Sequence, residues 1–433
     1  MNKILKILVI ALCLLMLASL AACNNEGGNE ITTPNDTTPS ATTPAETTPT
    51  PETEPPKPER EKMEYFKNYV SNTLAGTSNQ LYFDNSSANG GVSEGMMFYK
   101  ATVGGEFEYS VLFSNSIDST YASGNSGVPN MKLDDFEITG VKLGVLGGKE
   151  LTNPQNAEGK MTLVSTAVSK YTHTNGVTYF ETAPVKLNAA ADDYIAVAVE
   201  FKGSRVPCHV ESLIPSYKKE GGSWKSSKDV PLANMVGIKR DVKATVAYLG
   251  DSITQGIGVG QNNYVFWNAI TSKKLGNDYA YWNLGIGYAR CKDAATDGSW
   301  LFKAKQADYV VVCLGVNDIS SDKATGTQLC QNLKKVVDKL NEAGCEVILQ
   351  TVPPYTSYND NGIKTWYTAN DYIRNELSKS VVAVFDQTEL LMTDKKLPNV
   401  VRYGGHPSKF GCKIWGEELY KFLIANVDEF KAN

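Results

Sequence analysis

The sequence has few histidines, no block of basic residues and no cysteine pattern typical of a metal site. Lysine and arginine are scattered and the formal net charge is −5, so we expect no nucleic-acid partner. Beyond residue 200 no cysteine belongs to a CxxC pair or lies near a histidine at ligand spacing, which argues against a structural zinc site. Disulfides cannot be assigned from sequence, but Cys313 lies in an apolar run and is predicted to be a buried thiol. These six cysteines are Cys208, Cys291, Cys313, Cys330, Cys345 and Cys412.

Long apolar runs are also missing, except at the N-terminus. Residues 1–22 have a basic start and an apolar stretch that is too short, and wrongly flanked, for a permanent membrane span. The stretch ends in Leu20-Ala21-Ala22-Cys23, which closely resembles a bacterial lipoprotein signal peptide. That resemblance implies cleavage before Cys23, lipid on Cys23, and a mature protein at the cell surface that contacts the membrane only through this lipid. The alternative is an ordinary secretory signal that happens to contain a cysteine.

Residues 23–61 offer almost nothing apolar to bury. They are mostly Thr, Pro, Glu, Gly and Asn, with Thr-Thr-Pro repeated. Proline-rich chain stays extended at about 3 Å per residue. We therefore predict a disordered tether that could hold a folded body up to roughly 100 Å from the membrane.

In residues 62–236 hydrophobic side chains recur at every second position, as in strands with one buried face. Clusters of Gly, Asn, Asp and Ser separate these runs, and the one helical pattern is a short series that starts at Met63. This region is therefore predicted to be an all-β sandwich, jelly-roll-like in type. The predicted strands are 97–103, 107–113, 136–146, 161–168, 177–187 and 194–201.

Two smaller expectations concern the same region. His173 and His209 have no acidic or cysteine partners in register, and both are expected to be ordinary surface or loop residues. The polar, glycine-containing stretch 218–229 is expected to be the hinge to the next domain.

In residues 240–433 strand and helix patterns alternate. A parallel strand covered on both faces should be continuously apolar, as residues 310–314 are. The pattern predicts a three-layer α/β/α domain with a parallel five-stranded sheet. The predicted strands are 244–250, 279–286, 308–315, 346–352 and 381–385; the predicted helices lie near 262–275, 291–304, 325–343 and 363–379, with a last one after Pro407.

Each of the first three strands of this domain ends in a polar signature. These are Gly250-Asp-Ser-Ile-Thr254, Asn283-Leu-Gly-Ile-Gly287 and Gly315-Val-Asn-Asp318. The carboxyl ends of parallel strands share one edge of the sheet, where α/β proteins place their chemistry. Acyl transfer needs a nucleophile, a base and donors for the developing oxyanion. Ser252 can be the nucleophile, and its own N–H, an N–H after Ile286 and the Asn317 amide can be the donors.

His406 is the only histidine of this domain, so it is the one candidate for the base. It lies in Gly404-Gly-His-Pro-Ser-Lys-Phe-Gly411, on the loop before the last helix, which Pro407 is expected to start.

With these signatures in this order, residues 244–425 resemble the SGNH or GDSL family of serine hydrolases. The resemblance implies an esterase or acylhydrolase without a metal or organic cofactor. It also implies Ser252 as nucleophile, His406 as base and Asn317 in the oxyanion hole. More weakly, the β-rich region resembles the sandwich that precedes this domain in some extracellular relatives.

Two positions depart from the family pattern. An acid usually stands three residues before the histidine, where this chain has Tyr403, and a glycine is usual where it has Tyr288. The Tyr288 N–H remains a candidate oxyanion donor. His406 is expected to be oriented by a backbone carbonyl or the Tyr403 region, or else by a distant carboxylate, Asp386 first. Asp251 and Asp318 are expected to brace loops by accepting backbone hydrogen bonds.

The sequence thus predicts a surface-tethered serine esterase that removes small acyl groups, acetyl above all, from extracellular polysaccharide or oligosaccharide. A lipase or thioesterase of the same family is one alternative. A glycan-binding lipoprotein with a decayed hydrolase domain is another, because of Tyr403 and Tyr288.

Overall fold

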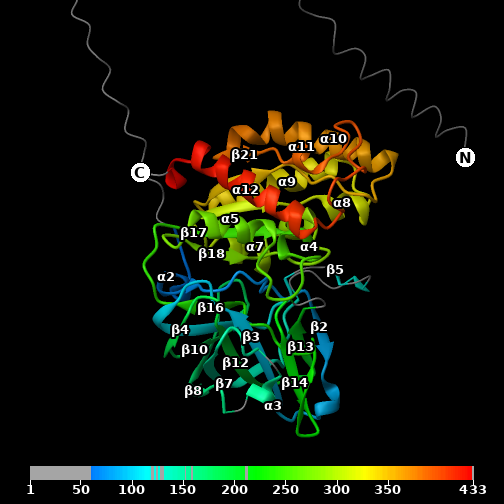
Figure 1. Ribbon diagram of the computed structural model, residues 1–433. Coiled ribbons are helices and arrows are strands. Elements are labelled where there is room, and N and C mark those ends of the chain that lie inside the picture. The colour runs from blue at the N-terminus through cyan, green and yellow to red at the C-terminus, as the bar shows by residue number, and fades with distance from the viewer. Residues whose placement is uncertain are drawn as a thin grey trace, which may run out of the picture. The chain divides into compact units, whose positions relative to one another are not determined.

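The computed structural model describes residues 60–118, 131–151, 153–157, 159–209 and 213–431, and the backbone of 121–122 and 125–126 (Figure 1). The predicted signal peptide, Cys23 and the predicted tether up to residue 59 lie outside these residues. From Arg60 onward the described chain belongs to one compact unit. No helix in this described part is long and apolar enough to cross a membrane.

The N-terminal part consists of two antiparallel sheets of six strands each. The first runs in the order β1-β16-β4-β10-β9, with β11 also paired to β4, and the second in the order β15-β14-β3-β12-β7-β8. The first sheet contains β1 (Val70–Ser71), β4 (Gly105–Ser114), β9 (Val168–Thr172), β10 (Thr178–Thr182), β11 (Val185–Ala189) and β16 (Met235–Ile238). The second contains β3 (Ser93–Lys100), β7 (Glu137–Leu146), β8 (Val164–Thr166), β12 (Tyr194–Lys202), β14 (Ser216–Glu220) and β15 (Ser223–Ser226).

The two sheets bury one face of each against the other, which confirms the predicted sandwich. Val111 and Phe113 of β4 belong to the same buried cluster as Met97 and Tyr99 of β3. Smaller elements complete this part: α2 (Glu64–Asn68), α3 (Pro154–Ala157), and the pairs β2 (Leu81–Asp84) with β13 (Arg205–Cys208) and β5 (Tyr121–Ala122) with β6 (Asn125–Ser126).

Two expectations for this region are wrong. Residues 218–229 are no hinge, because most of them form the β14–β15 hairpin. Its turn residues Gly221 and Gly222 both have positive φ, 57° and 81°, which glycine adopts readily and which suits a tight hairpin. His209 lies in a loop but not at the surface, because it is 1% exposed and burial lowers its pKa to about 3.

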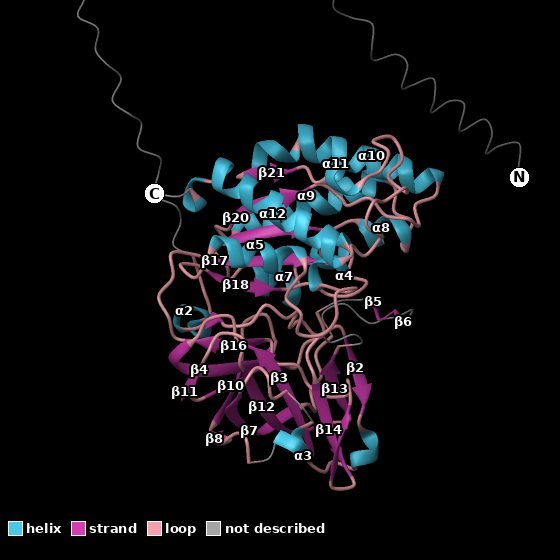
Figure 2. Cartoon of the chain, viewed as in Figure 1, coloured by secondary structure: helices cyan, strands magenta, loops and turns pink. Residues whose placement is uncertain are grey.

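The C-terminal domain is built on a parallel sheet of five strands in the order β18-β17-β19-β20-β21 (Figure 2). The strands are β17 (Thr245–Gly250), β18 (Ala280–Asn283), β19 (Tyr309–Cys313), β20 (Glu346–Gln350) and β21 (Ala383–Phe385). The chain leaves β17 toward β18 on one side and later returns to β19 on the other. The strand order therefore reverses at β17, and such a reversal opens a crevice at the carboxyl ends of the strands.

Helices cover both faces of this sheet, as predicted for three layers. One group pairs α5 with α12, and the other packs α6, α7 and α10 on α9. The connection from β17 to β18 runs one way along the sheet, and the connections from β18 to β19 and onward run the other way. Since each crossover is right-handed, the two groups lie on opposite faces. The helices are α4 (Ser252–Gln255), α5 (Trp267–Leu275), α6 (Cys291–Ala294), α7 (Ser299–Ala304), α8 (Val316–Ser320), α9 (Gly326–Glu342), α10 (Asp360–Asn375), α11 (Thr388–Leu391) and α12 (Lys409–Asn426).

The helix boundaries follow local signals. Thr325 and Gln328 form a capping box at the start of α9. Helix α12 begins at Lys409 with Ser408 as its N-cap, and not at Pro407 as predicted. The predicted helix 291–304 is divided into α6 and α7, because Asp297 between them has a left-handed φ of 58°. All six cysteines from Cys208 onward are buried thiols without a disulfide, including Cys313.

The first described residues bind to the C-terminal domain. Arg60, which the prediction placed in the tether, forms an ion pair of 2.7 Å with Asp308, and Lys62 bonds to the same carboxylate at 2.7 Å. Asp308 directly precedes β19. The tether prediction was therefore too long by at least its last two residues.

Residues 71–80, which we call the junction segment, join the sandwich to the C-terminal domain. Every residue of this segment is buried although most are polar. Near it, Lys303 of α7 forms an ion pair of 2.6 Å with Asp118, and the two side chains are 2% and 0% exposed. Asp118 also accepts hydrogen bonds from Asn79 N at 2.7 Å and Ser299 Oγ at 2.8 Å. Burial lowers the pKa of the Lys303 ammonium, and Asp118 opposes that shift.

Replacing Asp118 should reveal how strongly this ion pair supports the fold. Asp118→Asn leaves the Lys303 charge buried without a counter-charge, so we expect about 3 kcal/mol of destabilisation in urea denaturation. The double variant with Lys303→Met carries no buried charge and should recover part of this loss. Lys186→Met, which breaks an exposed pair with Glu106, should change stability by about 0.5 kcal/mol or less. A double variant as unstable as Asp118→Asn alone would show that the ion pair is not the cause.

Candidate active site

Ser252 stands at the carboxyl end of β17, at the point where the strand order reverses. Gly250 ends the strand, and a Cβ there would overlap Thr254 and the carbonyl oxygen of Cys313, so only glycine fits. Asp251 then caps the short helix α4 by accepting a hydrogen bond of 2.9 Å from Ile253 N. This tight turn places Ser252 as the first residue of α4, partly accessible to solvent.

His406 lies beside Ser252 although 154 residues separate them in the chain. The distance from Ser252 Oγ to His406 Nε2 is 2.8 Å, a hydrogen bond through which the imidazole can accept the hydroxyl proton. The ring of Tyr355 packs edge-on against the imidazole, with ring centroids 5.9 Å apart and an interplanar angle of 84°. The structure therefore brings the predicted nucleophile and base together and adds Tyr355, which the sequence analysis missed.

The loop after β18 is held against the turn that carries Ser252. The Asn283 side chain accepts a hydrogen bond from Gly285 N at 2.9 Å and donates to Thr254 O at 3.1 Å and Leu74 O at 3.0 Å. Tyr288 at the end of this loop has a φ of 63°, the left-handed region that favours glycine. The chain thus keeps a glycine-like backbone where its residue departs from the family pattern.

Asn317 lies in the first turn of α8, after β19. Its Nδ2 donates a hydrogen bond of 3.0 Å to Ala289 O, and its side chain is 8% exposed. An amide nitrogen carries two hydrogens, so Asn317 can hold the loop after β18 and also donate to a substrate oxygen. In the residues the structure describes, no three His, Cys, Asp or Glu side chains are grouped as metal ligands.

Asp251 and Asp318 are buried carboxyls that contact backbone N–H groups. Asp318 accepts hydrogen bonds from Cys291 N at 2.7 Å and Lys292 N at 3.3 Å, at the start of α6. Burial raises the pKa of Asp251 to about 7 and that of Asp318 to about 6. Both side chains hold the loops around Ser252 and Asn317 in place.

Residues 248–414 match the model of the GDSL-like Lipase/Acylhydrolase family. The chain contains a GDSL-like lipase/acylhydrolase domain. The match extends from β17 into α12 and so includes all the loops described above. No curated protein matches the sequence.

Many solved structures are similar to parts of the chain, among them three esterases. A family two carbohydrate esterase from Clostridium thermocellum, in complex with cellohexaose, is 15% identical and covers 83% of this chain and 99% of its own, with a TM-score of 0.38. An aryl esterase from M. smegmatis is 18% identical and covers 42% of this chain and 99% of its own, with a TM-score of 0.35. A carbohydrate acetylesterase from Sinorhizobium meliloti is 17% identical and covers 42% and 98%, with a TM-score of 0.35.

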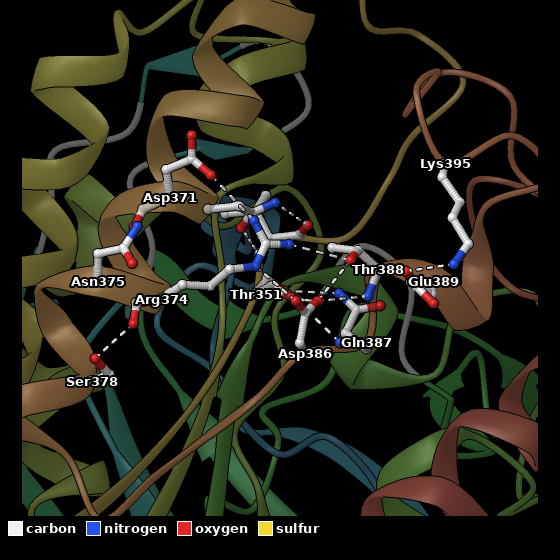
Figure 3. Close-up of polar contacts among 12 residues, drawn as sticks. Thr351, Asp371, Arg374, Asn375, Ser378, Asp386, Gln387, Thr388, Glu389 and Lys395 are labelled. Atoms are coloured by element: carbon white, nitrogen blue, oxygen red, sulfur yellow. Dashed lines mark hydrogen bonds and ion pairs between the residues drawn. The ribbon is translucent and has the colours of Figure 1, made fainter.

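Asp386, the first candidate for a distant acid in the GDSL-like domain, has other partners. Its carboxylate accepts hydrogen bonds from Arg374 Nε at 2.7 Å, Thr388 Oγ1 at 2.6 Å and Thr351 Oγ1 at 3.2 Å (Figure 3). His406 is not among them. The structure therefore argues against Asp386 as the acid that orients the imidazole. Arg374 of α10 holds Asp386 just after β21, the outermost strand of the sheet on the side away from β17 and β18.

Tyr403, at the usual position of the acid, takes a structural role in the GDSL-like domain. Its carbonyl oxygen accepts a hydrogen bond of 3.0 Å from Ser408 N, and its ring packs against Phe410 with centroids 5.5 Å apart.

Sequence reasoning also missed Arg290, which pairs with Asp293 at 2.9 Å and Asp322 at 3.2 Å beside the Asn317 loop. Its i,i+3 spacing to Asp293 at a helix start was the available signal.

Replacing Asp251 should change how stability depends on pH. The folded protein keeps a proton on Asp251 up to about pH 7, whereas the unfolded chain releases it near pH 4. The free energy of unfolding of the wild type therefore decreases as pH rises from about 4 to about 7. Asp251→Asn cannot ionise and keeps the oxygen that caps α4. We expect it to gain about 2–4 kcal/mol relative to wild type between pH 4 and pH 8 in urea denaturation. Asp241→Asn, at an exposed site, is the matched control, and an equal pH slope in all three proteins would contradict the assignment.

Proposed function

We propose that this protein is an extracellular serine esterase that hydrolyses small acyl esters, acetyl first among them, on carbohydrate. The observation that carries the proposal is the 2.8 Å hydrogen bond between Ser252 Oγ and His406 Nε2 at the edge of a GDSL-like domain. A hydroxyl bonded to an imidazole in a site open to solvent is the arrangement that nucleophilic ester cleavage needs.

In this mechanism the Ser252 hydroxyl oxygen attacks the ester carbonyl carbon while His406 takes its proton. The carbonyl oxygen becomes an oxyanion that the N–H groups of Ser252 and Tyr288 and the Asn317 amide stabilise. The imidazolium then returns the proton to the sugar oxygen as the C–O bond breaks, which leaves an acyl-serine. A water molecule activated by His406 hydrolyses this ester and releases the acid.

Aromatic side chains exposed beside the site support a sugar as the group that carries the ester. Tyr288 is 41% exposed, and Phe410, four residues after His406, is 62% exposed and backed by the Tyr403 ring. Exposed aromatic ring faces suit the C–H faces of a pyranose. The sequence also has no apolar lid-like stretch of the kind that would cover a lipid chain.

The proposed location rests on the N-terminal sequence. The residues before Cys23 have the pattern of a lipoprotein signal, and the Thr/Pro-rich stretch after it suits a spacer between membrane and enzyme. A lipid on Cys23 would hold the protein at the cell surface, where acylated polysaccharides of a wall or of the environment are within reach.

Ser252→Ala should abolish hydrolysis. With residues 24–433 as purified protein, we expect acetate release from acetylated xylan or cell-wall glycan to fall by at least about 10³-fold, because the nucleophile is removed. An organophosphonate probe should label the wild type and not this variant. Ser378→Ala, remote from the site, should behave as wild type. If the wild type binds glycan but neither releases acetate nor reacts with the probe, the glycan-binding alternative is favoured. If it cleaves only long-chain esters, a lipase is favoured.

Phe410→Ala should separate polymeric from small substrates. Losing one stacking face is expected to raise KM for an acetylated polysaccharide about fivefold. The kinetics for a small soluble acetyl ester should stay within about twofold, because the reacting groups are untouched. Val382→Ala, which removes another exposed apolar side chain, is the control. Equal losses on both kinds of substrate would mean that Phe410 supports the site rather than the sugar.

A further inference from the structure

A glutamine of the sandwich bonds to the loop that carries a proposed oxyanion donor. Gln80 ends the junction segment and is 1% exposed. Its Nε2 donates a hydrogen bond of 2.7 Å to the carbonyl oxygen of Gly287, in the loop after β18. This bond joins two residues 207 positions apart and reaches from the sandwich into the GDSL-like domain.

The bonded carbonyl belongs to the same peptide unit as the Tyr288 N–H. A trans peptide is planar, and its C=O and N–H point in opposite directions. Fixing the Gly287 oxygen on the sandwich side therefore aims the Tyr288 N–H away from the sandwich. Since the proposed function assigns that N–H to the oxyanion hole, we infer that Gln80 is a positioning residue for the oxyanion donor.

The loop needs such a support because its backbone is not one that tyrosine prefers. Tyr288 has a φ of 63°, and the left-handed conformation costs a residue with a side chain about 1 kcal/mol. A free loop would relax toward a conformation that turns the peptide, and the N–H with it. The bond from Gln80 holds the peptide in the orientation that this strained φ defines.

Gln80 is itself held rigidly. Its backbone N–H donates to Cys208 O at 2.9 Å, so the residue is tied to β13 of the sandwich. The preceding Asn79 donates its N–H to Asp118 at 2.7 Å and its side-chain amide to Ser116 O at 2.9 Å. Asp118 in turn pairs with Lys303 of α7 at 2.6 Å. A chain of buried bonds thus fixes Gln80 relative to the domain that it supports.

The test is a kinetic comparison in the full-length chain between two buried glutamines at the same junction. Gln80→Met keeps the length of the side chain and removes the donor to Gly287. Gln306→Met is the matched control, because Gln306 is also buried and bonds to Met63 N at 2.9 Å and Phe302 O at 3.3 Å, with no bond to the loop. For a small acetyl ester we expect Gln80→Met to lower kcat about 10- to 100-fold with KM within about twofold, and Gln306→Met to change neither by more than about twofold.

Gln80→Glu provides a second readout with nearly the same shape. Burial of the new carboxyl raises its pKa, so at low pH its O–H can still donate to the Gly287 oxygen, and the donor is lost when the group ionises. The kcat of Gln80→Glu should therefore fall relative to wild type as pH rises. An unchanged kcat in folded Gln80→Met, or in folded Gln80→Glu at every pH, overturns the inference. So does a failure of both to fold while Gln306→Met folds normally, because Gln80 would then be structural only. If wild-type activity does not depend on Ser252, the proposed function fails instead, whatever Gln80 does.

Discussion

The side chain of Asn283 joins three segments whose alignment the active site requires. Its carboxamide binds the turn of Ser252 through Thr254 O, its own loop through Gly285 N and the sandwich through Leu74 O. All four residues are buried, and an unmade hydrogen bond in such a place costs about 1–3 kcal/mol. The position of the Ser252 turn relative to the oxyanion loop therefore depends on how the junction segment packs. The antiparallel part contributes to the shape of the site as well as standing before it in the chain.

Buried charge is distributed unevenly around this arrangement. At the catalytic edge Asp251 and Asp318 are carboxyls with raised pKa values that hold backbone N–H groups without a directly bonded cation. At the junction, by contrast, Asp118 is paired with Lys303. Buried carboxyls without a paired cation reduce the stability of the fold at neutral pH. The Asp118–Lys303 ion pair instead opposes separation of the sandwich from the C-terminal domain, because breaking it would leave a buried charge without its counter-charge. The buried carboxyls near Ser252 thus destabilise the fold locally, and contacts elsewhere offset this destabilisation.

Much of this structure could be predicted because its determinants are periodic or unique. The continuous apolar run of β19 and the alternation in β4 indicated parallel and antiparallel sheets, and the structure confirms both. His406 was selected because the domain has no other imidazole and because the carboxyl ends of parallel strands meet. The predictions that failed concern side chains whose bonding partners are set by tertiary packing. Asp386 ends a strand as a catalytic acid could, but only the packing of α10 shows that Arg374 binds it.

Other features had a local signal whose meaning depended on context. Gly221 and Gly222 were compatible with a hinge and with a hairpin turn, and pairing with β3 decides for the hairpin. The tyrosine at position 288 gave no hint of a left-handed φ, and only the glycine usual there in the family pattern pointed to it. His209 was judged by the absence of acidic or cysteine residues in register with it in the sequence, which does not report burial. Such features require the tertiary arrangement, since none follows from residue type and spacing alone.

The position of Arg60 has a directional consequence. Arg60 and Lys62 bind Asp308, at the amino end of β19, whereas Ser252 follows the carboxyl end of the neighbouring strand β17. In a parallel sheet these ends lie on opposite edges. The chain therefore enters the folded body on the side away from the catalytic serine. In the proposed lipid-anchored protein, the anchor and the catalytic serine are therefore attached at opposite edges of the same sheet.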